Sequence, residues 1–221
     1  IANRFVLVAG LGSAWKTILT GIVPALIVIA TTVVIELKMS GQSLPHCLRL
    51  LGFGPLHTRQ LALGTLSLVP IAAAYLIMFK VLHVQASLGA LWPLALLKFT
   101  IAQGVAEEVV FRGFVFRHLR AGRSFGHAAT IAAVLFSIFH LANLFHGFSV
   151  EILIGIGISM TFSFLLTYPF AFLFEQGRGV LWGLTVMHVG IDSINVFPKA
   201  TEPGLGMMVY LLGIVISGAT V

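Results

Sequence analysis

The sequence has few charged residues and only one cysteine. Asp, Glu, Lys and Arg make up 9% of the 221 residues, whereas 58% are hydrophobic, and the mean hydropathy is +1.05. Soluble globular chains carry about 25% charged residues, so this composition excludes a soluble domain. The lone Cys47 excludes an intrachain disulfide and any metal cluster built on cysteines.

Several common signatures are also missing from the sequence. It has no internal repeat, no cleavable signal and no lipidation motif. Neither Gly-x-Ser-x-Gly nor His-Glu-x-x-His occurs, which argues against the usual signatures of serine hydrolases and zinc metalloproteases. The chain begins at Ile1 without a methionine, as expected of a chain that has lost its original N-terminus.

Long apolar runs separated by short polar connections dominate the chain. Each run approaches the roughly 20 residues that cross about 30 Å of hydrocarbon. We therefore expect an all-α fold, a polytopic membrane helix bundle that forms a single domain over residues 1–221. About seven transmembrane helices are predicted, Pro70 should kink the second, and residues 1–14 are a candidate eighth or interfacial helix. The predicted spans are 16–35, 61–79, 92–116, 128–145, 152–174, 179–197 and 204–217.

The basic residues indicate an orientation in the membrane. The net charge of +6 is carried by so few residues that it indicates topology rather than nucleic-acid binding. Because loops rich in Lys and Arg stay in the cytoplasm, the more basic side is predicted to be cytoplasmic. With seven spans, this side receives Lys38, Arg49, Arg59, Arg117, Arg120, Arg123 and Arg178. The opposite side receives Arg4, Lys16, Lys80 and Lys199.

Three charged residues, Glu107, Glu108 and Arg112, lie close together within the apolar run 92–116. Each ionised side chain in a bilayer costs at least about 2.5–3.5 kcal/mol on insertion scales, so charged residues within a span indicate a structural or functional role. On a helix Glu108 and Arg112 are four residues apart and can form an ion pair, whereas Glu107 is turned about 100° away. A purely structural ion pair leaves Glu107 unexplained. We favour Glu108 and Arg112 as a support and Glu107 as a working acid or base.

Two further polar groups lie within predicted spans. His140 is followed three residues later by Asn143, and His188 is followed by Asp192 and Asn195 at helical spacing. At about 1.5 Å per residue from the predicted cytoplasmic boundaries, Glu107, His140 and His188 lie at depths of about 15, 18 and 14 Å. Three helices thus bring their polar residues to nearly one level, which favours a shared site.

This set of residues is suited to hydrolysis of an amide by activated water. Glu107 and His140 can polarise a water molecule, and His188 with Asp192 can hydrogen-bond an oxygen that becomes negative in the transition state. Asn143 and Asn195 are candidate supports for the substrate or this oxyanion.

The order of the motifs resembles that of a known family. Motifs of the CPBP intramembrane endopeptidases, which include the enzymes that process prenylated CAAX proteins and bacteriocin-related relatives, recur over about 103–195. The matching motifs are Glu107-Glu108-x-x-x-Arg112, Phe136-x-x-x-His140 and His188-x-x-x-Asp192.

The resemblance implies an intramembrane protease with its catalytic core at about 92–197. It implies that Glu107 activates water with the support of Glu108 and Arg112, and that His140 assists. His188 and residue 192 would stabilise the oxyanion. CAAX enzymes usually have Asn where this chain has Asp192, and an ionised Asp would repel an oxyanion. We therefore expect Asp192 to be protonated or to orient His188.

Other classes of protein remain alternatives. No cofactor is expected, but Glu107, His140 and His188 can also supply the two-His, one-carboxylate set of catalytic zinc. A proton-coupled transporter would also need buried Glu and His, although no repeat halves are present. A catalytically idle scaffold or immunity protein is a third class.

The expected partners are the lipid bilayer and a membrane-anchored protein or peptide, in a prokaryotic cell membrane. A cavity that opens towards the cytoplasmic half would suit the tail of such a substrate. A prenylated tail, a bacteriocin leader and a sorting segment all stay open as that tail.

Overall fold

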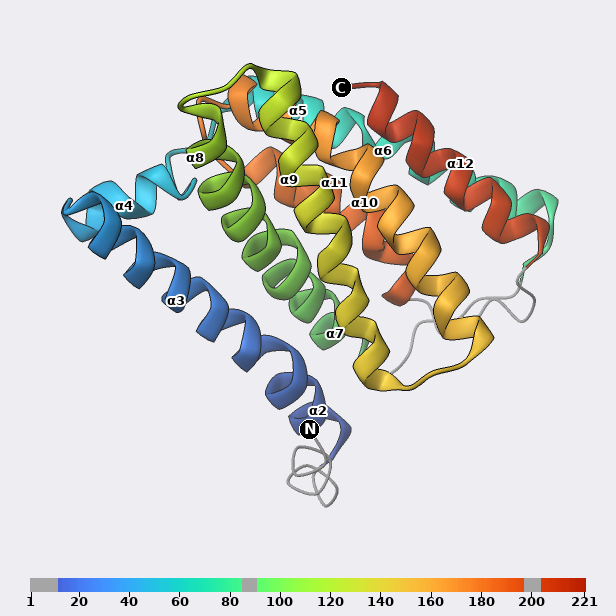
Figure 1. Ribbon diagram of the computed structural model, residues 1–221. Helices are drawn as coiled ribbons and strands as arrows, with labels where there is room; N and C mark the ends of the chain where they lie inside the picture. Colours follow the sequence, from blue (N-terminus) through green and yellow to red (C-terminus); the bar gives the residue numbers. More distant parts are fainter. Residues whose placement is uncertain (1–11, 85–90, 197–203) are drawn as a thin grey trace.

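The computed structural model describes residues 12–84, 91–196 and 204–221. The structure is 84% helix, and its described residues contain no strand. Helical runs alternate in direction between two ends of the molecule, with α2 and α7 near one end and α5, α8 and the C-terminus near the other (Figure 1). The predicted all-α class is therefore confirmed.

The helices follow the predicted apolar runs. The first half contains α2 (Ser13–Thr17), η1 (Ile18–Ile22), α3 (Val23–Ser40), α4 (Leu44–Leu50), α5 (Thr58–Leu66), α6 (Leu68–Leu76), η2 (Ile77–Val81) and α7 (Trp92–Phe99). The second half contains η3 (Thr100–Glu107), η4 (Val109–Phe116), α8 (Arg117–Arg120), α9 (Phe125–Phe139), η5 (His140–His146), α10 (Val150–Gln176), α11 (Trp182–Asp192), η6 (Ser193–Val196) and α12 (Leu205–Ala219).

Fewer helices qualify as membrane spans than the sequence suggested. Within the described ranges, length and composition identify four: Ala14–Ser40, Thr58–Val81, Phe125–Phe145 and Val150–Gln176. The predicted third span is helical from Trp92 onwards, but its charged residues make it less apolar than these four. The predicted last two spans contain the shorter helices α11 and α12. The four apolar helices make this an integral membrane protein.

The structure bears on two predicted features of the helices: the kink near Pro70 and the start of the sixth span. The helical run that contains Pro70 is interrupted at Ser67, between α5 and α6, where Pro70 has no N–H to donate to the carbonyl of Leu66; the kink itself stays a prediction. The predicted sixth span at 179–197 begins too early. Gly179 has a φ of 79° and closes the turn after α10 by donating its N–H to Phe174 O over 2.8 Å, so α11 begins only at Trp182.

A close contact between α5 and α11 holds the helix that carries His188. A Cβ atom placed on Gly64 would lie 2.2 Å from Gly183 O, so only glycine fits at this crossing. Beside it the buried Gln60 accepts a hydrogen bond from Gly183 N over 3.1 Å and donates to Leu173 O of α10 over 3.2 Å. Three helices are thereby joined at one point.

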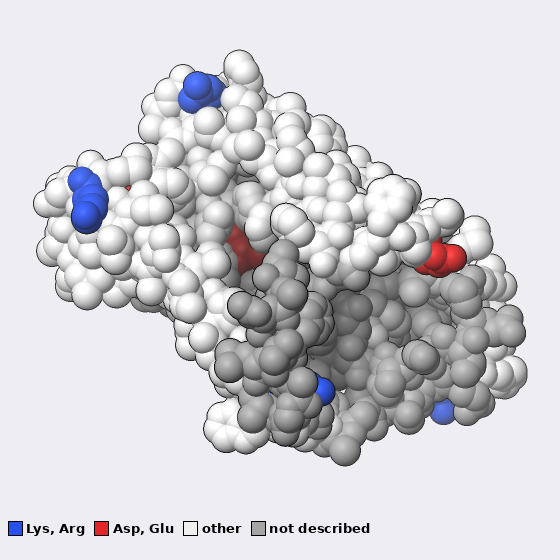
Figure 2. Space-filling model, turned by 60° about the horizontal axis from the view of Figure 1, so that its bottom comes forward, with Lys and Arg blue, Asp and Glu red and all other residues white. Residues whose placement is uncertain are grey.

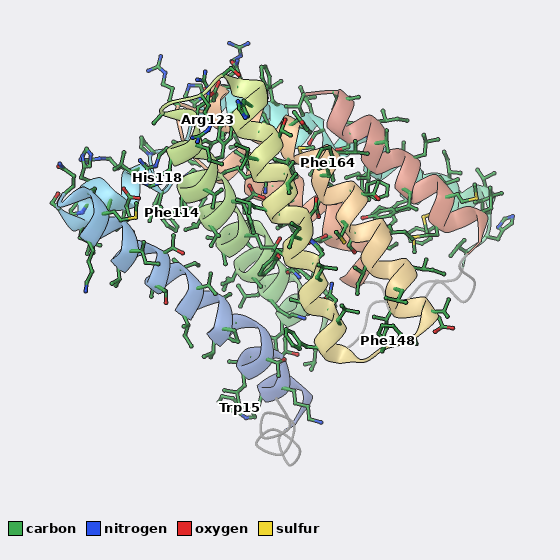
Figure 3. All side chains as sticks on the ribbon, in the orientation of Figure 1. Trp15, Phe114, His118, Arg123, Phe148 and Phe164 are labelled. Carbon is green, nitrogen blue, oxygen red and sulfur yellow. The ribbon has the colours of Figure 1, made fainter. Side chains whose placement is uncertain are left out.

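The two ends of the molecule carry different side chains. Arg123 and His118 lie at one end of the bundle, and Trp15 and Phe148 lie at the other (Figure 3). At the first end Arg117 donates to the buried Glu36 over 2.5 Å. Large apolar side chains are exposed along the sides of the bundle, as suits contact with lipid.

Candidate active site

The two adjacent glutamates lie where two π-helical segments meet. η3 ends at Glu107, and Glu108 connects it to η4. π-Helical turns are rare overall but are frequent at functional sites. η3 is fastened to α11 because Thr185 donates its hydroxyl to Gly104 O over 2.7 Å. The glutamates therefore face the helix that carries His188.

The expected ion pair between Glu108 and Arg112 is present and fully enclosed. Arg112 Nη1 lies 3.2 Å from Glu108 Oε1, and both side chains are at most 1% exposed. The guanidinium lies over the rings of Phe136 and Phe170, at 4.9 and 4.7 Å from their centroids. It also donates to Thr167 Oγ1 over 3.4 Å. These two cation–π contacts stabilise the desolvated charge.

His188 lies among three carboxyl groups. Its Nδ1 is 2.6 Å from Glu108 Oε1, and a carboxylate accepts, so Nδ1 carries the hydrogen. Its Nε2 lies 3.7 Å from Glu107 Oε2 and 3.6 Å from Asp192 Oδ2. Glu108 therefore orients His188 in addition to pairing with Arg112.

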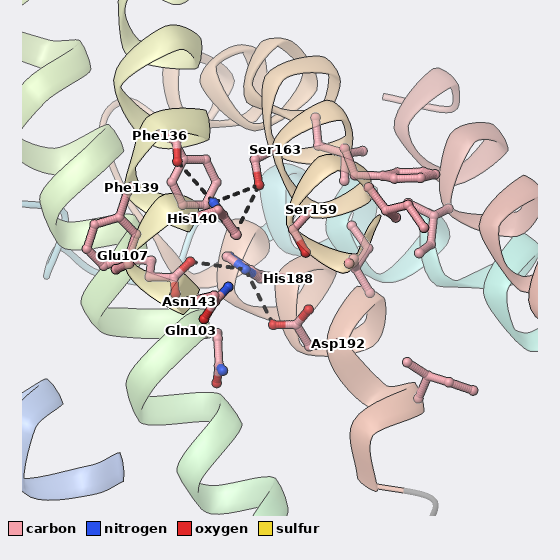
Figure 4. Close-up of a pocket in the computed structure, with 18 of the residues that line it drawn as sticks. Gln103, Glu107, Phe136, Phe139, His140, Asn143, Ser159, Ser163, His188 and Asp192 are labelled. Atoms are coloured by element: carbon pink, nitrogen blue, oxygen red, sulfur yellow. Dashed lines mark hydrogen bonds and ion pairs between the residues drawn. The ribbon is translucent and has the colours of Figure 1, made fainter. Parts of the chain in front are cut away.

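The site residues line a cavity of about 1640 Å³. The Glu107 side chain is 21% exposed and faces this cavity, whereas that of Glu108 is fully buried behind it. In the close-up, Glu107 and Asp192 flank His188 (Figure 4). A hollow with acidic atoms inside it is visible on one face of the molecule (Figure 2). Polar lining residues include Gln103, Glu107, His140, Asn143, His188 and Asp192.

His140 has a partner that sequence reasoning missed. It begins η5, and its Nδ1 lies 3.0 Å from Phe136 O, so Nδ1–H donates to that carbonyl and Nε2 accepts. The hydroxyl of Ser163 on α10 lies 3.2 Å from Nε2. Ser159, Ser163 and Thr167 are spaced four residues apart on this apolar helix and so form a hydroxyl stripe on one face. That spacing was the signal in the sequence.

The structure brings most of the predicted site together. Glu107, His140, Asn143, His188 and Asp192 share the cavity, and Glu108 and Arg112 support it from behind. The backbone of Asn195 lies in η6, but its side chain lies outside the described part of the structure. In the described ranges no group of three or more His, Cys, Asp or Glu is arranged to hold a metal ion.

Apolar helices that enclose carboxylates and imidazoles define an integral membrane protein with a hydrolase-type site. Residues 89–194 match the family model described as type II CAAX prenyl endopeptidase Rce1-like. Over this stretch the chain is similar to that family, and the suspected resemblance to CPBP endopeptidases is confirmed. No curated protein and no solved structure matches the chain.

Proposed function

We propose that this protein is an intramembrane endopeptidase that hydrolyses a peptide bond in a membrane-associated protein, using water activated by Glu107. One observation carries the proposal. Of the two adjacent glutamates, Glu107 faces the cavity, whereas Glu108 is buried against Arg112 and His188. One carboxylate is therefore available to substrate and water, and the other is committed to support.

The proposed reaction needs only groups that line or support the cavity. Glu107 takes a proton from water, whose oxygen forms a bond to the carbonyl carbon of the scissile peptide. His140 orients this water. His188 acts as the imidazolium: its Nδ1–H is held by Glu108, and its Nε2–H donates to the oxygen that becomes negative. The carbon–nitrogen bond then breaks, and the proton held by Glu107 passes to the leaving amine.

The remaining predicted residues position His188 or the substrate and do not contact the reacting atoms. Asp192 lies 3.6 Å from Nε2 of His188 and orients that atom towards the substrate. Asn143 lies in the same cavity and is proposed to hold the substrate backbone, as is Asn195. These roles fit amide side chains, which both donate and accept hydrogen bonds.

We further propose that the chain crosses the membrane of a prokaryotic cell about seven times. The alternating direction of the helical runs supports this count (Figure 1). The short helix α11 is largely buried inside the bundle, where it needs less apolar surface than a helix facing lipid.

Metal removal separates the proposed mechanism from a zinc mechanism. We expect activity to survive prolonged treatment with a chelator, because Glu107 and His140 are sufficient to polarise a water. The measurement is the rate of peptide hydrolysis in detergent before and after chelation, with the metal content determined in parallel. Loss of activity that returns on addition of zinc would show that a metal supplies the hydroxide.

Ser163→Ala should lower the turnover rate without unfolding the protein. The variant removes the hydroxyl beside Nε2 of His140, and a hydrogen bond of this kind contributes about 0.5–1.5 kcal/mol, so kcat should fall about three- to tenfold. Ser137→Ala is the matched control, because Ser137 also joins α9 to α10, through Met160 O over 3.0 Å. Equal loss of kcat in both variants would show that Ser163 only joins helices.

A further inference from the structure

A further hollow, of about 560 Å³, lies where α8 meets the end of α10. It shares no lining residue with the catalytic cavity, and its volume is within the range of small-molecule sites. α8 and the turn that follows α10 lie near the same end of the bundle (Figure 1). The two segments that line the hollow contribute Phe116, Arg117, Arg120 and Ala121, and Phe174, Glu175, Arg178 and Gly179.

The lining of this hollow is basic. Three arginines and one glutamate leave it with a net charge of +2. Glu175 Oε1 lies 2.6 Å from Arg120 Nε, so an arginine of the lining already neutralises this carboxylate. The hollow is therefore suited to an anion, and arginine recognises phosphate well because it can donate two parallel N–H groups to its oxygens.

Two of the arginines are held in place by contacts that leave part of each guanidinium available. Arg117 Nε donates to Gly113 O and Arg120 Nη1 donates to Arg123 O, each over 2.9 Å. Arg117 Nη2 contacts the buried Glu36, as Arg120 Nε contacts its own carboxylate partner. Among the described residues, Nη1 of Arg117 and Nη2 of Arg120 have no partner, so these N–H groups can donate to a ligand.

The third arginine, Arg178, has a backbone conformation that arginine rarely adopts. Its φ is 55°, in the left-handed region where glycine and asparagine are usual after a helix. The turn fixes this conformation, because Gly179 N–H donates to Phe174 O over 2.8 Å and Arg178 N–H donates to Glu175 O over 3.0 Å. Strained residues of this kind cluster at ligand-binding positions. Within the described ranges the Arg178 side chain has no ion-pair or hydrogen-bond partner.

The hollow adjoins a surface suited to lipid. α10 forms one of its walls and exposes Leu165 and Phe172, which are 53% and 39% exposed. These residues are seven apart and share one face of the helix. Glu175, which lines the hollow, follows one turn after Phe172. An acyl chain can pack along this face while its head group reaches the arginines, which favours a lipid over a soluble anion.

We propose that this hollow binds the phosphate group of an anionic phospholipid at the surface of the membrane. Arg178 and the available N–H groups of Arg117 and Arg120 donate to the phosphate oxygens, and the acyl chains lie against α10. Basic pockets between helices at a membrane surface bind lipid head groups in this way. The site is separate from the catalytic cavity, so the proposal does not depend on the protease function.

Binding of single lipids to the purified full chain tests the site. The measurement is native mass spectrometry in detergent with added phosphatidylglycerol, or with phosphatidylcholine of the same acyl chains, which has no net charge. We expect phosphatidylglycerol to bind about tenfold more tightly. Arg178→Asn should weaken its binding about tenfold, as expected for a lost hydrogen bond to a charged group. Asparagine suits the left-handed turn, and Arg178→Gly, which also suits it, should give the same loss.

Arg49→Gln is the matched control. Arg49 is exposed on α4 and does not line the hollow, so this variant removes the same charge and should bind phosphatidylglycerol as the unaltered protein does. Equal loss in Arg49→Gln would indicate a general attraction to basic residues and overturn the proposal. Unchanged binding in both Arg178 variants, or equal binding of the two lipids, would also overturn it. Inorganic phosphate that displaces phosphatidylglycerol at equal concentration would assign the site to a soluble anion instead.

Discussion

Glu107→Gln should abolish peptide hydrolysis while the fold and substrate binding persist. A general base typically contributes about 10²–10⁴-fold to the rate, and the amide cannot accept the proton of water, so kcat should fall by at least this factor. Gln has the same shape as Glu, and the side chain faces a cavity rather than a packed core. The measurement is single-turnover cleavage of a membrane peptide in detergent, with binding followed separately.

Glu151→Gln provides the matched control for this variant. Glu151 also lines the cavity, at the start of α10, but it lies at the open end and has no place in the proposed reaction. We expect it to keep its turnover rate. Near-normal activity of Glu107→Gln would contradict the assignment of the water-activating base, and equal loss in both variants would indicate a general effect of charge in the cavity.

Arg112→Ala should destabilise the protein strongly as well as inactivate it. Removing one partner of a buried ion pair typically costs about 3–5 kcal/mol, because the other charge is left unpaired. Here the fully buried Glu108 would lose Arg112, and the cation–π contacts with Phe136 and Phe170 would be lost as well. Since folded domains are stable by only about 5–15 kcal/mol, the loss should be visible as a large drop in melting temperature.

The exposed pair of Arg120 with Glu175 is the control for this prediction. Its atoms approach to 2.6 Å, closer than those of Arg112 and Glu108, but the two side chains are 40% and 36% exposed. Exposed pairs contribute about 0–1 kcal/mol, so Arg120→Ala should scarcely change the melting temperature. A stable, active Arg112→Ala protein would show that the enclosed pair is not a support.

Contacts between residues close in the sequence were largely predictable. The spacing of four residues puts Glu108 beside Arg112 and His188 near Asp192, because helical periodicity alone brings such side chains to one face. The all-α class followed in the same way from long apolar runs. The number of membrane spans could not be predicted in this way, because length and hydropathy do not show which helical runs are short or are covered by neighbouring helices.

The contact between Glu108 and His188 joins residues 80 positions apart, and that between His140 and Ser163 joins residues 23 positions apart. No periodicity within one helix encodes either contact. They depend on the packing of η3 on α11 and of α9 on α10, which glycines and hydroxyls at the helix crossings permit. Composition and spacing by themselves determined that this is a membrane helix bundle with charged residues inside its apolar helices. Only the tertiary structure decided which glutamate faces the cavity, because exposure depends on the helices packed against each side chain.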